Sequence, residues 1–193
     1  MKKEEKRVFL RVVAKMTALL AAVLLVAGVA VETASAKTAA EIEAAVNASL
    51  NRFYTQVKGG KEMVAKAKGL LVMPNVYKAG LIVGGEYGEG ALRVGGKTVS
   101  YYNLASGSVG LQIGGQAKDF VILFMTDEVL KKFQASEGWE VGIDGNVALV
   151  TIGGGERVDF TKMKDPIIGF VFDVKGLMAD ISLKGAKFSK MSK

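Results

Sequence analysis

The chain has 193 residues, a formal net charge of +7, and neither histidine nor cysteine. The lack of both residue types excludes a disulfide framework and excludes Ser-His-Asp and Cys-His catalysis. It also removes the usual ligands of zinc and copper sites, so we expect no metal and no other cofactor. Carboxylate-based or lysine-based chemistry stays open.

The N-terminal segment has the three parts of a secretory signal peptide. Basic residues dominate residues 2–15, an uncharged apolar run follows over residues 16–31, and the tripeptide Ala-Ser-Ala ends at Ala36. The apolar run of 16 residues is shorter than the ~20 residues that a membrane-spanning helix needs. We therefore expect cleavage near Ala36 and a single exported domain over residues 37–193, which is periplasmic or peripheral on an envelope membrane.

Much of the positive charge belongs to this N-terminal segment. Residues 1–36 hold six of the 26 basic and three of the 19 acidic residues, which leaves 20 and 16, or a net charge of +4, for residues 37–193. This mild excess is not the composition of a nucleic-acid-binding domain, so we expect no nucleic acid partner.

Helix signals come first in the predicted domain. Residues 39–57 place apolar side chains on one helical stripe, and Thr38 with Glu41 forms a capping box at its start. A Gly-Gly pair ends this helix, and a second short helix is predicted over residues 61–68. Core packing of the first helix is favoured over membrane-surface binding, because its polar face is largely acidic.

Short strands follow the helices. The run LLVM predicts a strand that Pro74 ends, and the Gly-Gly pair within residues 94–97 predicts a tight hairpin. The run FVILFM at residues 120–125 is apolar on both faces, which favours a central buried strand, and Thr126 with Asp127 begins a further helix.

Glycine is about twice as frequent in residues 37–193 as the usual ~7%, which favours bulges and bends within the strands. The sequence thus predicts an α+β fold. It consists of a strongly curved, Gly-rich antiparallel sheet or small barrel, an N-terminal helix pair, and one further helix at about residues 126–136.

The stretch LIVGGEYGEG, residues 81–90, invites comparison with phosphate-binding loops, and it fails both templates. No Lys-Ser or Lys-Thr follows its glycines, the third dinucleotide-binding glycine is replaced by Arg93, and two carboxylates would repel an anion. Glu86 and Glu89 are instead candidates for a catalytic pair, although strand residues three apart point to opposite faces. A carboxylate-dependent hydrolase acting on an envelope glycan or lipid is therefore an alternative function.

Four long phrases together resemble the SYLF lipid-binding domain family: AKAKGLLVMPNVYKAGLIVGGEYGEG, GKTVSYYNLASGSVGLQIGGQAKDFVILFMTDEVLKKFQAS, GWEVGIDGNVALV and IIGFVFDVKGLMADISLKGAKFSK. The resemblance covers roughly residues 50–190. It implies non-catalytic binding to anionic phospholipid, because yeast and animal members are phosphoinositide- and actin-binding modules of endocytic proteins. Those relatives use a basic N-terminal helix, whereas the first helix here is largely acidic. Actin is not expected as a partner of an exported protein.

Lysines supply a physical route to an anionic membrane surface, since each lysine near such a surface contributes ~1 kcal/mol. The candidate docking residues surround the second predicted helix: Lys58, Lys61, Lys66, Lys68 and Lys78. A secondary basic set lies near the C-terminus: Lys184, Lys187, Lys190 and Lys193. An ordinary solvated face, with Lys66 paired to Glu62, is the competing interpretation. A scaffold that binds another envelope protein through an apolar surface is a further alternative.

Overall fold

The computed structural model describes residues 37–80, 83–109, 114–153, 163–176 and 182–193. The predicted signal peptide lies outside these residues. Among the residues that are described, no helix is both long and apolar enough to cross a membrane.

Three helices are described: α2 (Ala39–Gln56), α3 (Gly60–Lys66) and α4 (Asp127–Ala135). The predicted capping box begins α2: the Thr38 hydroxyl accepts from the Glu41 amide, and the Glu41 carboxylate accepts from the Thr38 amide at 2.7 Å. The Thr126 hydroxyl similarly accepts from the Val129 amide at the start of α4. The helix pair and the later helix are thus as predicted.

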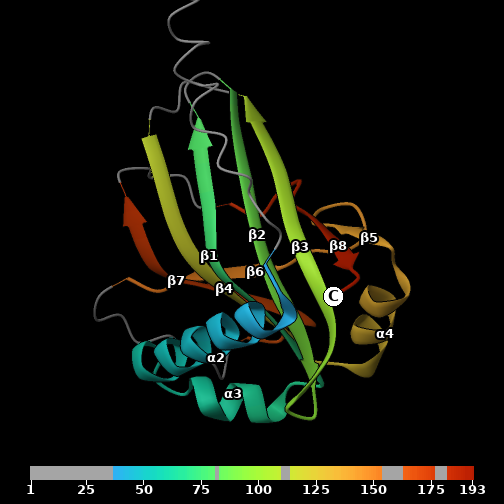
Figure 1. Ribbon diagram of the computed structural model, residues 1–193. Helices are drawn as coiled ribbons and strands as arrows, with labels where there is room; N and C mark the ends of the chain where they lie inside the picture. Colours follow the sequence, from blue (N-terminus) through green and yellow to red (C-terminus); the bar gives the residue numbers. More distant parts are fainter. Residues whose placement is uncertain (1–36, 81–82, 110–113, 154–162, 177–181) are drawn as a thin grey trace, which may run out of the picture. The chain divides into compact units, whose positions relative to one another are not determined.

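Eight strands form one strongly curled sheet, a half-barrel (Figure 1). They are β1 (Gly69–Gly80), β2 (Val83–Val94), β3 (Lys97–Val109), β4 (Gly114–Phe124), β5 (Gly138–Glu140), β6 (Ala148–Thr151), β7 (Ile167–Gly176) and β8 (Lys187–Met191). Their spatial order is β5-β8-β3-β2-β1-β4-β7-β6. All neighbouring pairs are antiparallel except β6 and β7, which are parallel. The predicted α+β fold with a strongly curved sheet is confirmed, and the parallel pair at this edge makes the sheet mixed.

The sheet carries an apolar core on each face. The outer core lies under α2 and α3 and includes Ile42, Phe53 and Phe170. The inner core fills the concave side against α4 and includes Phe133 and Trp139. Figure 1 shows α2 and α3 across the lower part of the sheet and α4 beside β5 and β8. Alternate side chains of the apolar β4 run enter the two cores, so this strand is central and buried on both faces, as predicted.

β1 continues through Pro74, which the sequence predicted as its end. A β-bulge shifts its register against β2 and β4, and Asn75 within the bulge has a φ of 49°. The Asp119 carboxylate accepts a hydrogen bond from the Asn75 amide at 2.8 Å. The bulge also changes which residues face inward, since Met73 and Val76 both join the inner core.

β2 contains most of the stretch LIVGGEYGEG and approaches β1 very closely. A Cβ built on Gly90 would lie 1.9 Å from the Val72 carbonyl oxygen, so no larger residue fits without moving the backbone. Over residues 83–90, the prediction that this stretch is strand rather than phosphate loop is confirmed. The predicted hairpin turn also forms, with positive φ angles at Gly95 and Gly96.

Candidate functional site

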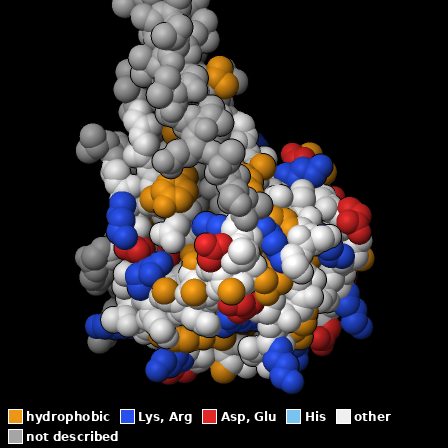
Figure 2. Space-filling view, viewed as in Figure 1, with side chains coloured by type: hydrophobic (Ala, Val, Ile, Leu, Met, Phe, Trp, Pro, Cys, Tyr) orange, Lys and Arg blue, Asp and Glu red, His pale blue; other side chains and the backbone are white. Residues whose placement is uncertain are grey.

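Four of the predicted docking lysines are exposed and lie close together in the chain, around α3. We call them the lysine cluster: Lys58, Lys61, Lys66 and Lys68. Basic side chains project along the lower margin of the molecule in Figure 2, where Figure 1 places α3. The expected pairing of Lys66 with Glu62 is absent among the described residues, and none of the four lysines has an ion pair there.

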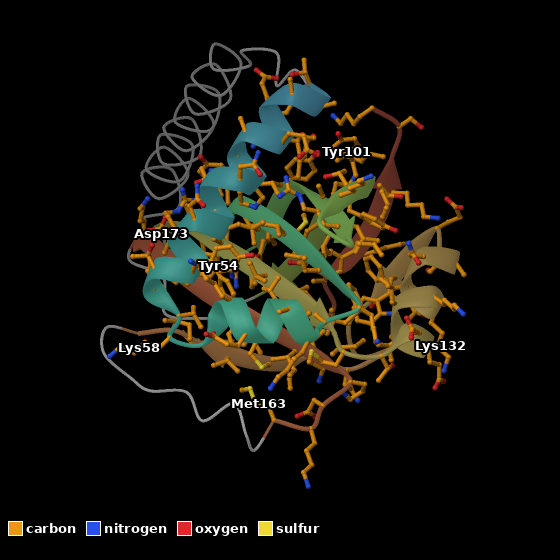
Figure 3. The ribbon with its side chains drawn as sticks, turned by 90° about the horizontal axis from the view of Figure 1, so that it is seen from below. Tyr54, Lys58, Tyr101, Lys132, Met163 and Asp173 are labelled. Atoms are coloured by element: carbon orange, nitrogen blue, oxygen red, sulfur yellow. The ribbon has the colours of Figure 1, made fainter. Side chains whose placement is uncertain are left out.

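The cluster sits beside aromatic and apolar surface from α2. The ammonium group of Lys61 lies 5.8 Å from the centre of the Tyr54 ring, a cation–π distance. Figure 3 shows Lys58 at the edge of the domain near Tyr54, whereas Lys132 of α4 lies on the opposite side. The exposed charge at the α3 end is therefore separated from the basic residues of α4.

A pocket of about 330 Å³ opens next to this cluster, between α2, α3, the start of β1 and the end of β2. Leu50, Val64 and Leu70 form part of its wall, and Tyr54 and Lys68 also line it. Its volume falls at the lower end of the range for small-molecule pockets. Burial raises the pKa of Tyr54, so its phenol stays protonated at neutral pH. The pocket thus combines an apolar wall with two cations at its lining, Lys68 and Arg93, of which Arg93 is paired with Glu43.

Lys78 does not belong to this exposed surface. It is only 4% exposed and lies on β1, where its Cα is paired with Glu86 on one side and Gln116 on the other. After the bulge, β1 alternates so that Val76 and Lys78 are buried while Tyr77 is exposed. A buried ammonium group cannot dock on a flat membrane surface, so the inclusion of Lys78 in the docking set is corrected.

Glu86 is part of a buried ion pair inside the half-barrel. Its carboxylate lies 3.1 Å from the Lys118 ammonium group, and both side chains are almost fully buried. The Ser106 hydroxyl donates to it at 3.5 Å, and Lys118 also lies over the Phe120 ring. Lys118 is not among the site residues predicted from the sequence, although the charged Lys-Asp pair directly before the apolar run of β4 is a visible signal.

Glu89 lies on the opposite face of β2 from Glu86. Its carboxylate accepts hydrogen bonds from the Tyr87 hydroxyl at 2.8 Å and from the Lys37 amide at 3.2 Å, and it is 4% exposed. The two glutamates therefore do not share a space in which one substrate could contact both, as their spacing predicted. No group of His, Cys, Asp and Glu side chains that could hold a metal ion is found in the described part of the chain.

A second buried acid, Asp119, joins α2 to the bulge of β1. It pairs with Arg52, accepts from the Ser49 hydroxyl at 2.8 Å, and caps the Asn75 amide. Arg52 also lies 3.0 Å from the Asp173 carboxylate. This network is fully used in holding the helix and the bulge together, so it is structural in character.

The secondary basic set does not form one surface. Lys187 and Lys190 lie on β8 three residues apart, so their side chains point to opposite faces of the sheet. Lys193 donates to the Lys37 carbonyl at 2.6 Å. Lys184 lines a separate pocket of about 370 Å³ with Val141 and other residues. These lysines are therefore distributed over several environments.

The comparisons with known proteins agree with the family resemblance. No curated protein matches the chain significantly. Residues 105–193 match the Ysc84 family model, whose description is Las17-binding protein actin regulator. The matched segment begins within β3 and includes every later helix and strand. This match confirms the resemblance of the chain to the SYLF family.

Proposed function

We propose that residues 37–193 form an exported, non-catalytic domain that binds anionic phospholipid at an envelope membrane surface. The SYLF family, a family of lipid- and actin-binding modules, gives the general class of activity. The lysine cluster carries the specific proposal, because its four exposed ammonium groups have no acidic partner among the described residues.

The cluster provides the charge that an anionic surface requires. At ~1 kcal/mol for each lysine, four lysines give enough attraction for reversible docking. The adjacent pocket supports the proposal, because its apolar wall is suited to the glycerol and acyl part of one lipid while Lys68 faces the phosphate. Actin is not part of this proposal, because the N-terminal segment predicts export.

Co-sedimentation of the exported, processed protein with vesicles tests this function. We compare vesicles of phosphatidylcholine, whose headgroup carries no net charge, with vesicles that also contain about 30% of a phospholipid whose headgroup is anionic. We expect binding to the anionic vesicles only, and we expect binding to weaken as salt is raised, since exposed charges are screened. Equal or negligible sedimentation with both kinds of vesicle would refute the proposal.

Matched lysine variants locate the surface. The double variant Lys61→Gln with Lys66→Gln removes two charges of the lysine cluster, and Lys131→Gln with Lys132→Gln removes two exposed charges of α4. The first is expected to lose about 2 kcal/mol, or roughly 30-fold in the partition coefficient, and the second little. Equal losses in both variants would show that net charge alone controls binding.

A further inference from the structure

The carboxylate of Glu89 is a buried negative charge whose nearest donors are both neutral. They are the Tyr87 hydroxyl at 2.8 Å and the backbone amide of Lys37 at 3.2 Å. The ammonium group of Lys193 lies farther away, at 3.7 Å, and donates instead to the Lys37 carbonyl. A buried carboxylate is strongly stabilised when a cation hydrogen-bonds to it directly, and here that position is held by a neutral peptide nitrogen.

The position of the Lys37 nitrogen is fixed by the start of α2. The next residue, Thr38, is held by both halves of its capping box with Glu41. The Thr38 carbonyl also accepts the first hydrogen bond of the helix, from the Ile42 amide at 3.0 Å. The nitrogen of Lys37 is therefore directed at Glu89 by ordered backbone on its C-terminal side.

The sequence places the predicted signal cleavage directly before this nitrogen. Hydrolysis of the bond between Ala36 and Lys37 consumes one water, gives Ala36 a carboxylate, and leaves Lys37 with an α-amino group. The ordinary pKa of such a group is about 7.7–8.0, so it is mostly an ammonium ion at neutral pH. Processing thus converts the neutral donor of Glu89 into a cationic donor at the same position.

We propose that Glu89 is a receptor for the mature N-terminus: signal removal after Ala36 creates the Lys37 α-ammonium, which pairs with the Glu89 carboxylate and fastens α2 to β2. This inference rests on the processing included in the proposed function, and it is independent of lipid binding. It assigns a role to one of the two glutamates of the stretch LIVGGEYGEG, and it makes the processed form more stable than its precursor.

The neighbouring charges are compatible with this pair at neutral pH. Burial, together with the hydrogen bond to Glu89 and its charge, raises the pKa of Tyr87 to about 12, so the phenol remains a donor. Hydrogen bonds from Thr38 lower the pKa of Glu41, which keeps that exposed carboxylate ionised nearby. Lys193 adds a second positive charge near the same carboxylate oxygen, 3.7 Å from Glu89 Oε2.

The test compares two exported forms of the whole precursor. One is the natural precursor, and the other carries one alanine inserted between Ala36 and Lys37, so that cleavage after Ala36 leaves the ammonium displaced by up to ~3.8 Å along the chain. The insertion leaves a neutral amide at Lys37 and moves the positive charge to the inserted alanine, one residue away. Mass spectrometry must first show that the natural mature protein begins at Lys37; a different start would overturn the inference.

Thermal unfolding then measures the pair. At pH 7 the insertion is expected to lower Tm by about 2–6 °C, because a charged hydrogen bond contributes more than a neutral one. In a Glu89→Gln background the difference should vanish, while in a background of Glu128→Gln, which changes an exposed carboxylate of α4, it should persist. Equal Tm values for the two natural-background proteins would overturn the inference, as would an unchanged difference with Glu89→Gln.

The pH dependence gives a readout that needs no change at Glu89. A pair with Glu89 raises the pKa of the α-amino group in the folded protein, so its stabilisation is fully present below the unfolded pKa of about 7.7–8.0 and is lost as pH rises through the raised value. The Tm difference should therefore shrink between pH 7 and pH 10. A difference that stays constant over this range would contradict an ammonium origin. Both forms should bind anionic vesicles equally, because the pair with Glu89 does not involve lipid. If neither form bound vesicles, the proposed lipid function would fail while the Tm difference could still stand.

Discussion

Breaking the buried ion pair between Glu86 and Lys118 is expected to reduce the free energy of unfolding by about 3–5 kcal/mol. The two charged groups are 3.1 Å apart, and the side chains of Lys118 and Glu86 are 0% and 2% exposed. At an effective dielectric constant of about 20, Coulomb's law gives an attraction of about 5 kcal/mol at this distance. Either single substitution leaves the other charge buried without this partner.

The two single variants should not be equal. Glu86→Gln leaves two buried lysines on the inner face, Lys118 and Lys78, whose Cα is paired with that of residue 86. Lys118→Met leaves Glu86 beside Lys78. We therefore expect the larger loss from Glu86→Gln, and we expect the double variant to be less destabilised than the sum of the single variants.

Urea unfolding followed by tryptophan fluorescence measures this coupling, because Trp139 is the only tryptophan and is buried in the inner core. A matched cycle on the exposed pair Glu128 and Lys132 of α4, whose charged groups are 2.8 Å apart, controls for charge changes alone. That pair should couple only weakly, because both side chains are exposed to solvent. A coupling between residues 86 and 118 no larger than this control would refute the reasoning from burial.

Three further predictions address the fold and its ionisable groups. Gly90→Ala should destabilise the domain by roughly 1–3 kcal/mol or more, because the new Cβ would meet the Val72 backbone. Gly85→Ala should be neutral or mildly stabilising, because a Cβ there meets nothing within 4 Å. Equal Tm values for the two variants would contradict this prediction. Asp119→Asn should cost about 1–3 kcal/mol in urea unfolding by weakening its bonds to Arg52, Ser49 and the bulge, and an unchanged midpoint would show that the network is dispensable. Burial, with a smaller effect of the Glu137 charge, raises the pKa of Tyr102 to about 12. The domain should therefore lose stability as pH rises from about 10 to 12. Tyr102→Phe should reduce this loss, and an alkaline unfolding transition identical to that of the natural protein would show that Tyr102 does not cause it.

Local signals in the sequence predicted the elements well where the physical cause is itself local. The capping box of Thr38 and Glu41 set the start of α2, and the two glycines after Val94 set the β2–β3 turn. Both features depend on hydrogen bonds or φ angles within a few residues. The four lysines around α3 are exposed, which both interpretations of the sequence, a docking surface and a solvated face, require.

Lys78 shows why the rest could not be predicted. Strict alternation from the inward residues Leu71 and Met73 would place residue 77 inside and Lys78 outside. The bulge near Pro74 adds one residue to β1, so that Val76 and Lys78 face inward instead. The bulge is held by Asp119, which lies 44 residues from Asn75 in the sequence. The sequence around Pro74 therefore does not predict the bulge, or the change of face that the bulge gives to every later side chain of β1. The parallel pairing of β6 with β7 depends on tertiary context in the same way.

The edge strands of the described sheet bear on how readily the protein aggregates at high concentration. The two edge strands, β5 and β6, have only three and four residues, whereas five of the six interior strands have ten or more and the sixth, β8, has five. A short edge offers another chain few free amides and carbonyls to pair with, and natural sheets use this to resist fibril growth. Where β8 covers Tyr101–Ala105 of β3 and β6 covers Ile168–Val171 of β7, these long strands do not present their own edges to a second copy of the chain.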